Sequence, residues 1–531
     1  MMTTSAFEIL GPIMVGPSSS HTAGALRIAL VARSLGPHPL ESVTFTLYNS
    51  FAHTYRGHGS DRALVAGILG LAPDDTRVRD SFDLAREQGL DFTFVETPDE
   101  AGAGRHPNTV TVTMHGADGT TMSVTGESLG GGRVRISSID GIAVELTGDY
   151  PTLFIAHHDR PGVLAALTSG LSAASVNIAS MRTFRESRGG RAYTVFELDT
   201  TIDDGLLEYL RHAPNIQLAS VVNIPGSSRT APDAVLEHGF DTGAQLLSLA
   251  EREGATIGEV MRRRQLELFP TQDADALMAH VLQVMREETT APIENPLPSL
   301  GGLLGGQAKA VHDAAPRLAA ALMGETLTKA CAYAMAVLER SATMGVIVAA
   351  PTAGSAGVIP GAVLSVAESL GADDEQVARA LWNACAIGAI VARNASVAGA
   401  EGGCQAEVGT AAAMAASAVA ELMGADPKTC LSAASTAIAN LLGLVCDPVR
   451  GLVEYPCQDR NVIGVVDAVS AAQLALSGVL DPLPFDEVVA AMKSVGDSLP
   501  SALRETALGG LAAAPSACSA CRTGCGKATG K

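Results

Sequence analysis

The composition of this chain changes abruptly near residue 230. Before that point, strand-like alternation of apolar and polar residues mixes with helical periodicity, and beyond it alanine-rich helical stretches dominate. Alanine favours the helix and lets neighbouring helices approach closely. Residues 225–233 are rich in Pro, Gly and Ser, as linkers are. We therefore expect a multidomain protein with a large all-α C-terminal domain over residues 234–515 and a cysteine-rich tail over residues 516–531.

The part before the linker is predicted to form two smaller domains, because 531 residues are too many for one core. Residues 1–147 are predicted to be an α+β domain with a helix at Ala25–Leu35 and strands at Ser42–Tyr48 and Thr109–Met114. Residues 148–224 have the pattern strand, helix, strand, strand, helix, strand, which is the ferredoxin-like βαββαβ order.

The charge of the chain excludes several classes of partner. Its formal net charge is −20, and it has no block rich in Lys or Arg. Nucleic acid and anionic membrane are therefore not expected partners. The first ten residues lack the basic and apolar regions of a secretion signal, which favours a cytoplasmic protein. The uncharged stretches Gly345–Ala367 and Thr429–Cys446 contain prolines or polar residues, so we expect them to be buried in the helical domain.

Nine cysteines, an odd number without an export signal, favour metal or redox chemistry over disulfides. Three of them stand at breaks beside Gly or Pro, namely Cys404, Cys446 and Cys457. Three others lie within apolar helical runs, where a thiol is usually a small core residue. From the residues alone, buried core thiols remain the simpler interpretation of all six.

Two strings in the first 61 residues could bind a ligand. In Gly11–Thr22, hydroxyl groups and free N–H groups at a helix start suit an anion such as a carboxylate, and His21 titrates near neutrality. An ordinary capped helix is the alternative. In the second string His58 stands between two glycines, which allow close approach of a ligand, although a plain turn has the same pattern.

Six strings in a fixed order resemble a known family. They are Gly11–Thr22, Gly57–Asp61, Ala350–Gly357, Asn394–Ser396, Ala400–Gly409 and Cys446–Pro448. Together they resemble the iron–sulfur-dependent L-serine dehydratases over residues 6–145 and about 234–515, which match that family's β and α portions joined in one chain. The resemblance implies a lyase of serine catabolism that converts L-serine to pyruvate and ammonia.

The resemblance also implies a catalytic centre. Its [4Fe–4S] cluster would have three irons bound by Cys404, Cys446 and Cys457 and a fourth iron open to the substrate hydroxyl and carboxylate. His58 is the expected base for the Cα proton, with His21 as the second candidate or as a carboxylate anchor. The expected substrate-binding residues are the polar side chains Ser18, Ser19, Ser20, Thr22, Asn394 and Ser396.

The C-terminal tail and one substitution depart from the family pattern. In some relatives a cysteine near the C-terminus occupies the fourth iron until substrate displaces it. We hypothesise that Cys525 or Cys521 does so here, with a loose, solvent-exposed tail as the alternative. Gln307 stands where relatives are expected to have an acid, so no role is inferred for it.

The string His158–Gly162 resembles the ACT domain, a common amino-acid sensor of metabolic enzymes. The resemblance implies an amino acid, expected to be L-serine, bound near Asp159, Arg160 and Gly162 at an interface between paired domains. A spacer without ligand is the alternative. A homodimer is expected.

Two other functions fit parts of the sequence. A pyridoxal-phosphate (PLP) deaminase needs a Schiff-base lysine and a phosphate-binding loop, but Lys309 and Lys329 lie in no such motif, so we expect no PLP. A non-catalytic amino-acid sensor would use the ACT-like unit alone and would leave the cysteine and histidine strings without a role.

Overall fold

The computed structural model describes residues 4–97, 105–147, 150–222 and 236–519. These residues form two compact units, which are described separately. The helical unit comprises residues 4–19, 56–59 and 236–519, and the sheet unit comprises the described residues of 20–55 and 60–222. Residues 4–19 and 56–59 thus pack with the C-terminal helices, although in sequence they belong to the N-terminal region.

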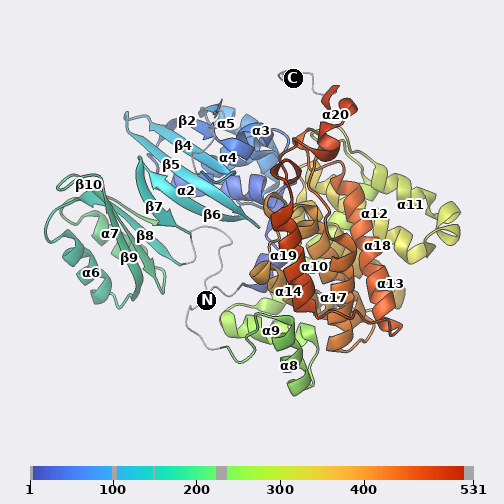
Figure 1. Cartoon of the computed structure of the whole chain (residues 1–531). Helices are drawn as coiled ribbons and strands as arrows, with labels where there is room; N and C mark the ends of the chain where they lie inside the picture. The colour runs from blue at the N-terminus through green and yellow to red at the C-terminus, as the bar shows by residue number, and fades with distance from the viewer. Residues whose placement is uncertain (1–3, 98–104, 148–149, 223–235, 520–531) are drawn as a thin grey trace. The chain divides into compact units, whose positions relative to one another are not determined.

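The sheet unit contains a six-stranded sheet in the order β3-β2-β4-β5-β6-β7 (Figure 1). β2 and β3 are parallel, and the other neighbours are antiparallel. Val43, Phe45 and Leu47 of β2 are buried while the residues between them are partly exposed, so the predicted alternation is present. α2 packs on α4 and on the sheet. The bounds are α2 (Ala25–Leu35), β2 (Leu40–Leu47), α3 (Asn49–Thr54), α4 (Ser60–Leu69), α5 (Ser81–Glu87), β3 (Asp91–Glu96), β4 (Thr109–Gly116), β5 (Thr121–Gly130), β6 (Arg133–Ile139) and β7 (Ile142–Leu146).

A second, four-stranded sheet in the order β11-β8-β10-β9 belongs to the same unit. Its elements are β8 (Thr152–His158), α6 (Val163–Ala173), β9 (Ile178–Arg185), β10 (Arg191–Leu198), α7 (Asp204–Arg211) and β11 (Ile216–Val222). Leu167 of α6 and Leu210 of α7 share one core with strand residues such as Phe196, so both helices cover one face of the sheet, at the left of Figure 1. Asp140 links the two sheets, because its Oδ2 accepts hydrogen bonds from Tyr193 Oη (2.9 Å) and Arg191 Nη1 (3.1 Å).

Alanine-rich α16 lies at the centre of the helical unit, packed against α13, α14, α17 and α18. Every residue from Thr410 to Ala420 is buried, because small side chains allow close packing on all sides. The bounds are α1 (Ala6–Ile9), α8 (Gly243–Glu253), α9 (Ile257–Leu268), α10 (Ala274–Glu294), α11 (Gln307–Leu318), α12 (Gly324–Ala342), α13 (Val358–Leu370), α14 (Asp374–Asn394), α15 (Gly399–Gly402), α16 (Thr410–Leu422), α17 (Pro427–Leu441), α18 (Cys457–Leu476), α19 (Phe485–Ser498) and α20 (Pro515–Ser519).

One strand corrects the expectation that this part is entirely helical. β12 (Val346–Val348) pairs antiparallel with β1 (Ile13–Val15), so that Ile13 lies opposite Val348. Three β-branched residues are too short a run to predict a strand, and the partner strand is more than 300 residues away in sequence. The pairing attaches the start of the chain to the helical unit.

The apolar segment Ala353–Leu370 is the one described stretch long and apolar enough to cross a membrane. Within it, 78% of the residues are buried in the structure, and α13, which forms most of it, packs against α12, α16 and α18. A lipid-facing helix would expose its apolar side chains, so this segment is a core helix, as expected for Gly345–Ala367.

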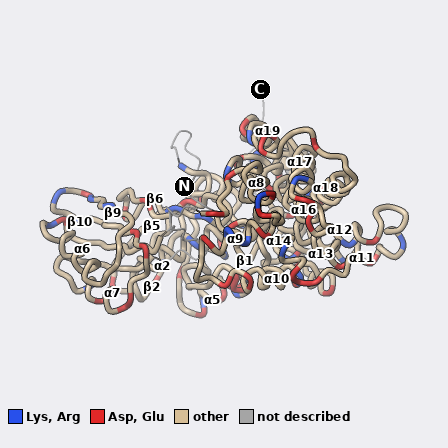
Figure 2. The backbone as a smooth tube through the Cα atoms, turned by 90° about the horizontal axis from the view of Figure 1, so that it is seen from below, with Lys and Arg blue, Asp and Glu red and all other residues tan. Residues whose placement is uncertain are grey.

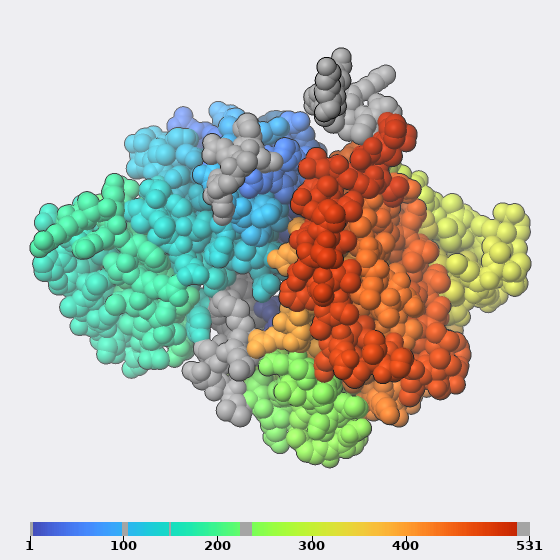
Figure 3. All heavy atoms as spheres, viewed as in Figure 1, coloured from blue at the N-terminus to red at the C-terminus, as the bar shows by residue number. Residues whose placement is uncertain are grey.

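Residues of both charges are scattered over the described chain. In Figure 2 the Lys and Arg positions and the Asp and Glu positions are interspersed along the tube, with no continuous basic stripe among the described residues. In Figure 3 the yellow segment that contains α11 projects from the helical unit. Leu322 and Met323, which follow it, are 75% and 45% exposed.

Candidate active site

The three cysteines at chain breaks occupy three different local structures in the helical unit. Cys404 precedes a π-helical turn, Gln405–Gly409, Cys446 lies in the loop after α17, and Cys457 is the first residue of α18. The backbone of Cys446 is held on both sides: its N–H donates to Leu503 O (2.9 Å) and its carbonyl accepts from Glu505 N–H (2.9 Å). π-Helical turns are rare and are frequent at functional sites.

The three thiols lie at one site. Burial raises the pKa of the Cys404 thiol to about 12 and raises those of Cys446 and Cys457 well above the ordinary value. After burial and the nearby carboxylates, Cys404 and Cys457 raise the pKa of Cys446 further, and an interaction of this kind requires proximity. The three cysteines form no disulfide.

Two buried carboxyl groups stand beside these thiols. Burial raises the pKa of Glu407 to about 7, against a hydrogen bond from the Thr352 hydroxyl (2.8 Å) that lowers it. Burial and then the charge of Glu407 raise the pKa of Glu505 to about 8. The site thus combines three thiols with two acids that are partly protonated near neutral pH. Glu407 lies in one of the family strings, whereas no sequence pattern singled out Glu505.

The first turn of α18 joins Cys457 to the glycine-rich segment Ala349–Gly361. Asn461 Nδ2 donates to Gly354 O (2.8 Å), and its Oδ1 accepts from Gly357 N–H (3.1 Å). The same segment provides the Thr352 hydroxyl for Glu407, so these contacts fix its backbone at the thiol site.

The other glycine-rich segment, Leu300–Gln307, uses its N–H groups within the protein. Glu454 Oε1 accepts from Gly301 N–H (2.8 Å) and its Oε2 from Leu303 N–H (2.9 Å), while Glu339 caps the following helix. Those donors are therefore not open to a ligand. Gln307 makes local contacts, accepting from Gly305 N–H (2.6 Å).

Close approach of backbone to the site explains the glycine at 399. A Cβ there would lie 2.5 Å from Glu407 Oε2 and 3.3 Å from Cys446 Sγ. Since any side chain would displace these groups, only glycine fits without rearrangement.

Part of the two N-terminal strings belongs to the same unit as the cysteines. β1 leads directly to Ser18 and Ser19, and the Gly16 N–H donates to Gly345 O (3.3 Å). His58 is fully buried, and a Cβ on its neighbour Gly59 would meet Met344 Sδ at 2.9 Å. His58, Ser18 and Ser19 thus share the helical unit with the three thiols.

The rest of the first string belongs to the sheet unit, namely Ser20, His21 and Thr22. The buried ring of His21 has both nitrogens engaged, Nδ1 with Ser20 Oγ and Nε2 with Ser50 Oγ, each at 3.0 Å. Its edge-on contact with Phe51 fixes the ring further. These contacts suit a positioning role better than that of a proton acceptor.

The other predicted site residues have local partners. Asn394 Nδ2 donates to Asp241 O (2.7 Å) and Ser396 Oγ to Glu401 Oε2 (2.6 Å). Asp159 Oδ2 accepts from Gly189 N–H (3.0 Å), and this hydrogen bond lowers the pKa of the carboxyl. Arg160 is exposed, and Gly162 has the left-handed φ of 91° that starts α6. Cys521 and Cys525 lie outside the described residues.

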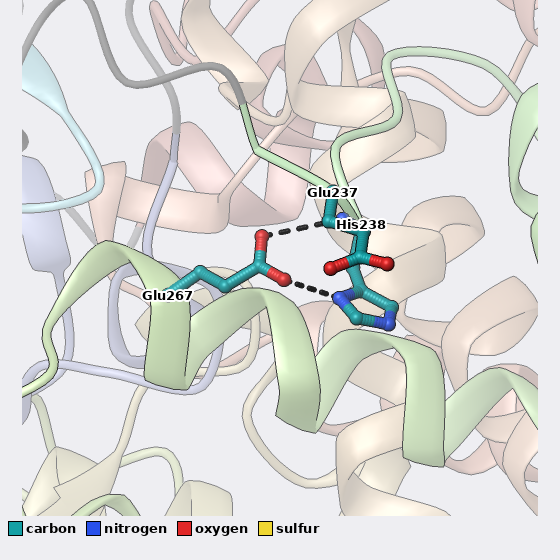
Figure 4. Close-up of side chains that lie close together, drawn as sticks. All are labelled: Glu237, His238 and Glu267. Carbon is teal, nitrogen blue, oxygen red and sulfur yellow. Dashed lines mark hydrogen bonds and ion pairs between the residues drawn. The ribbon is translucent and has the colours of Figure 1, made fainter.

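Figure 4 shows a separate cluster of Glu237, His238 and Glu267, whose donor atoms all lie within 4.8 Å of one another. His238 Nδ1 faces Glu267, and its Nε2 lies 3.1 Å from Glu253 Oε2. Because a carboxylate faces each ring nitrogen, both nitrogens already have partners within the protein, and this is a hydrogen-bonded cluster around one imidazole. Among the described residues, the sulfur atoms of Cys404, Cys446 and Cys457 do not all lie within 4.8 Å of one another, as the ligand atoms of this cluster do. Such a wider spacing suits three ligands that each bind a different iron better than three ligands around a single ion.

Comparison with known families assigns nearly the whole chain. The family model "Serine dehydratase beta chain" matches residues 5–138, "ACT domain" residues 152–211 and "Serine dehydratase alpha chain" residues 231–512. The L-serine dehydratase of Streptomyces coelicolor is 32% identical over 96% of this chain and 99% of its own length. L-serine dehydratase 2 of Escherichia coli is 30% identical over 97% and 99%, respectively.

In some relatives the alpha and beta portions are separate chains, and each of those chains matches one part of this protein. The probable L-serine dehydratase alpha chain of Bacillus subtilis is 43% identical over 52% of this chain and 92% of its own length. These matches show that the chain belongs to the serine dehydratase family and joins the beta portion, an ACT domain and the alpha portion in one polypeptide.

Proposed function

We propose that this protein is an iron–sulfur L-serine ammonia-lyase that converts L-serine to pyruvate and ammonia. Its family is of the iron–sulfur type. The observation that carries the proposal is the convergence of three free thiols, two buried and one partly buried, in the unit that also contains His58. The domain limits 1–147, 148–224 and 234–515 are part of the proposal.

The residues present fit a [4Fe–4S] cluster. Three thiols can each bind one iron, and the backbone of Gly399 approaches Cys446 Sγ so closely that no side chain fits there. When bound, the cluster supplies an open iron that acts as a Lewis acid for the departing hydroxyl of serine. We propose Cys404, Cys446 and Cys457 as its ligands and Cys525 or Cys521 as a displaceable fourth ligand.

In the proposed reaction His58 takes the Cα proton of serine. Its burial excludes water, so the proton is transferred to the ring rather than to solvent. We propose that His21, held by Ser20 and Ser50, positions the substrate carboxylate. The proposed substrate contacts are Ser18, Ser19, Ser20, Thr22, Asn394 and Ser396.

For the ACT domain we propose a ferredoxin-like fold that binds an amino acid, L-serine, near Asp159, Arg160 and Gly162. The observed element order and sheet order support the fold, and the Asp159–Gly189 hydrogen bond fixes the loop between β8 and α6. A changed serine dependence of the rate in an Arg160→Ala variant would support a ligand site, and an unchanged one would favour a spacer.

We also propose a homodimer. The projecting apolar residues Leu322 and Met323 are the kind of surface that an interface covers. Light scattering at micromolar concentration tests this, and a monomer would contradict it.

Anaerobic purification with iron and sulfide analysis, followed by a pyruvate assay on L-serine, tests the main proposal. We expect Cys446→Ser to lose iron and pyruvate formation, while Cys331→Ser, a change of another buried free thiol, retains both. Iron content and activity at wild-type level in Cys446→Ser would refute the cluster assignment.

The role of His58 has its own test. We expect His58→Gln to keep its iron while pyruvate formation falls by about 10²- to 10⁴-fold, the usual contribution of a general base. If His21→Gln alone caused such a loss, the assignments of the two histidines would be exchanged.

A further inference from the structure

Cys404, Cys446 and Cys457 belong to three separate segments, and the Arg460 side chain lies close to all three. Arg460 Nη1 donates to Val445 O (2.8 Å), and its Nη2 forms an ion pair with Asp447 Oδ1 (2.7 Å). Val445 and Asp447 are the residues on either side of Cys446, so the two arms of the guanidinium hold the Cys446 segment.

The same guanidinium reaches the other two segments. It lies near enough to Cys404 to lower the pKa of that thiol against the larger raising effect of burial, and it stands three residues after Cys457 on the first turn of α18. Its side chain is only 15% exposed. Asp447 extends the connection, because its Oδ2 accepts the Leu511 N–H (2.7 Å) near the end of the described chain.

Charge makes this position important. Cysteine binds iron as a thiolate, and a buried negative charge is stabilised by a positive charge close to it. A guanidinium is charged at every physiological pH, and Arg460 is held by the residues on either side of Cys446, one helical turn from Cys457.

We propose that Arg460 is a positioning residue that joins the three cysteine-bearing segments and compensates the charge of their thiolates. This inference rests on the proposed function, because it assumes that the thiols bind a cluster. Lysine would not replace Arg460, since an ammonium group is a point charge without the planar fork that reaches two partners at once.

The test compares the full-length wild type with Arg460→Met and Arg460→Lys, all purified anaerobically. The control is Arg450→Met, which makes the same change at an exposed arginine in the loop between Cys446 and α18. Iron per chain, the visible absorption of the cluster and the rate of iron loss to a chelator are measured, with circular dichroism to check folding.

We expect Arg460→Met to bind iron about 10- to 100-fold more weakly in chelator competition, as other changes to residues that orient metal ligands do. Arg460→Lys should fold and bind iron but lose it faster than wild type, and Arg450→Met should match wild type. If Arg460→Met does not fold, Arg460→Lys decides.

Two results would overturn the inference in distinguishable ways. Wild-type iron retention in Arg460→Lys, or in a folded Arg460→Met, would refute the role of Arg460 and leave the cluster assignment intact. Wild-type protein without iron and sulfide would refute the proposed function, and with it the premise of the inference.

Discussion

The buried side chain of Asp467 makes the stability of the protein depend on pH. Asp467 lies in α18, the helix that begins at Cys457. Its side chain is buried against α17, where Oδ1 accepts from Asn440 Nδ2 (2.7 Å) and Oδ2 has no hydrogen-bond partner among the described residues. Burial raises the pKa of Asp467 from 3.8 to about 6. Because the native state binds this proton more tightly than the unfolded state, ionisation costs stability as pH rises through this range.

The magnitude follows from that rise in pKa. At 1.36 kcal/mol per pKa unit, ionised Asp467 destabilises the native state by about 3 kcal/mol above pH 7 and by about 1 kcal/mol at pH 4.5. Asp467→Asn removes the ionisation and keeps an acceptor for Asn440. Any cost of the new amide is independent of pH. The free energy of unfolding of the variant, measured relative to that of wild type, should therefore be about 2 kcal/mol higher at pH 8 than at pH 4.5.

Thermal unfolding of wild type and Asp467→Asn at the two pH values measures this change. For a domain of this size, 2 kcal/mol corresponds to a difference of about 4 °C in Tm. A difference in Tm that is the same at pH 4.5 and pH 8 would refute the reasoning, since it would mean that the carboxyl is not desolvated in the native state.

Two further changes test packing near the site and in the core. Gly399→Ala should lower iron content and cost about 1–3 kcal/mol of stability, because its Cβ would overlap Glu407 and crowd Cys446; wild-type iron content and Tm would contradict the close approach. Arg264→Met should leave Tm unchanged or raise it, because Arg264 is buried over the Phe240 ring, burial lowers its pKa to about 10, and its Nε and Nη1 have no hydrogen-bond partner among the described residues. A loss of more than about 2 kcal/mol would show that this charge has a required role, since breaking a needed buried ion pair costs 3–5 kcal/mol.

The ACT domain contacts the N-terminal part of the sheet unit through side chains on two of its strands. Besides the Asp140 contacts, Ser220 Oγ of β11 donates to Ser34 O near the C-terminal end of α2 (2.9 Å). The string that contains His21 leads into the other end of that helix.

Local patterns were sufficient for much of the architecture. The alternation in β2 and β4 and the alanine-rich periodicity of α14, α16 and α17 predict element type, because both depend on neighbours along the chain. The order of strings from Gly11 to Pro448 identifies the family, and that resemblance, rather than the position of the cysteines at breaks, is what predicts Cys404, Cys446 and Cys457 as the residues that converge. These inferences need no knowledge of which distant segments meet.

Contacts between distant segments were decided by the tertiary structure alone. The pairing of Ile13 with Val348, the placement of Glu505 beside Glu407 and the reach of Arg460 to Cys404 each join residues that are remote in sequence. A buried acid or arginine carries no local signature, because its environment arises only when several helices pack around it. The amino-acid sequence thus determines the element types, the family and the candidate ligands. The packing of the helices determines which charges surround those ligands and at which positions only glycine fits.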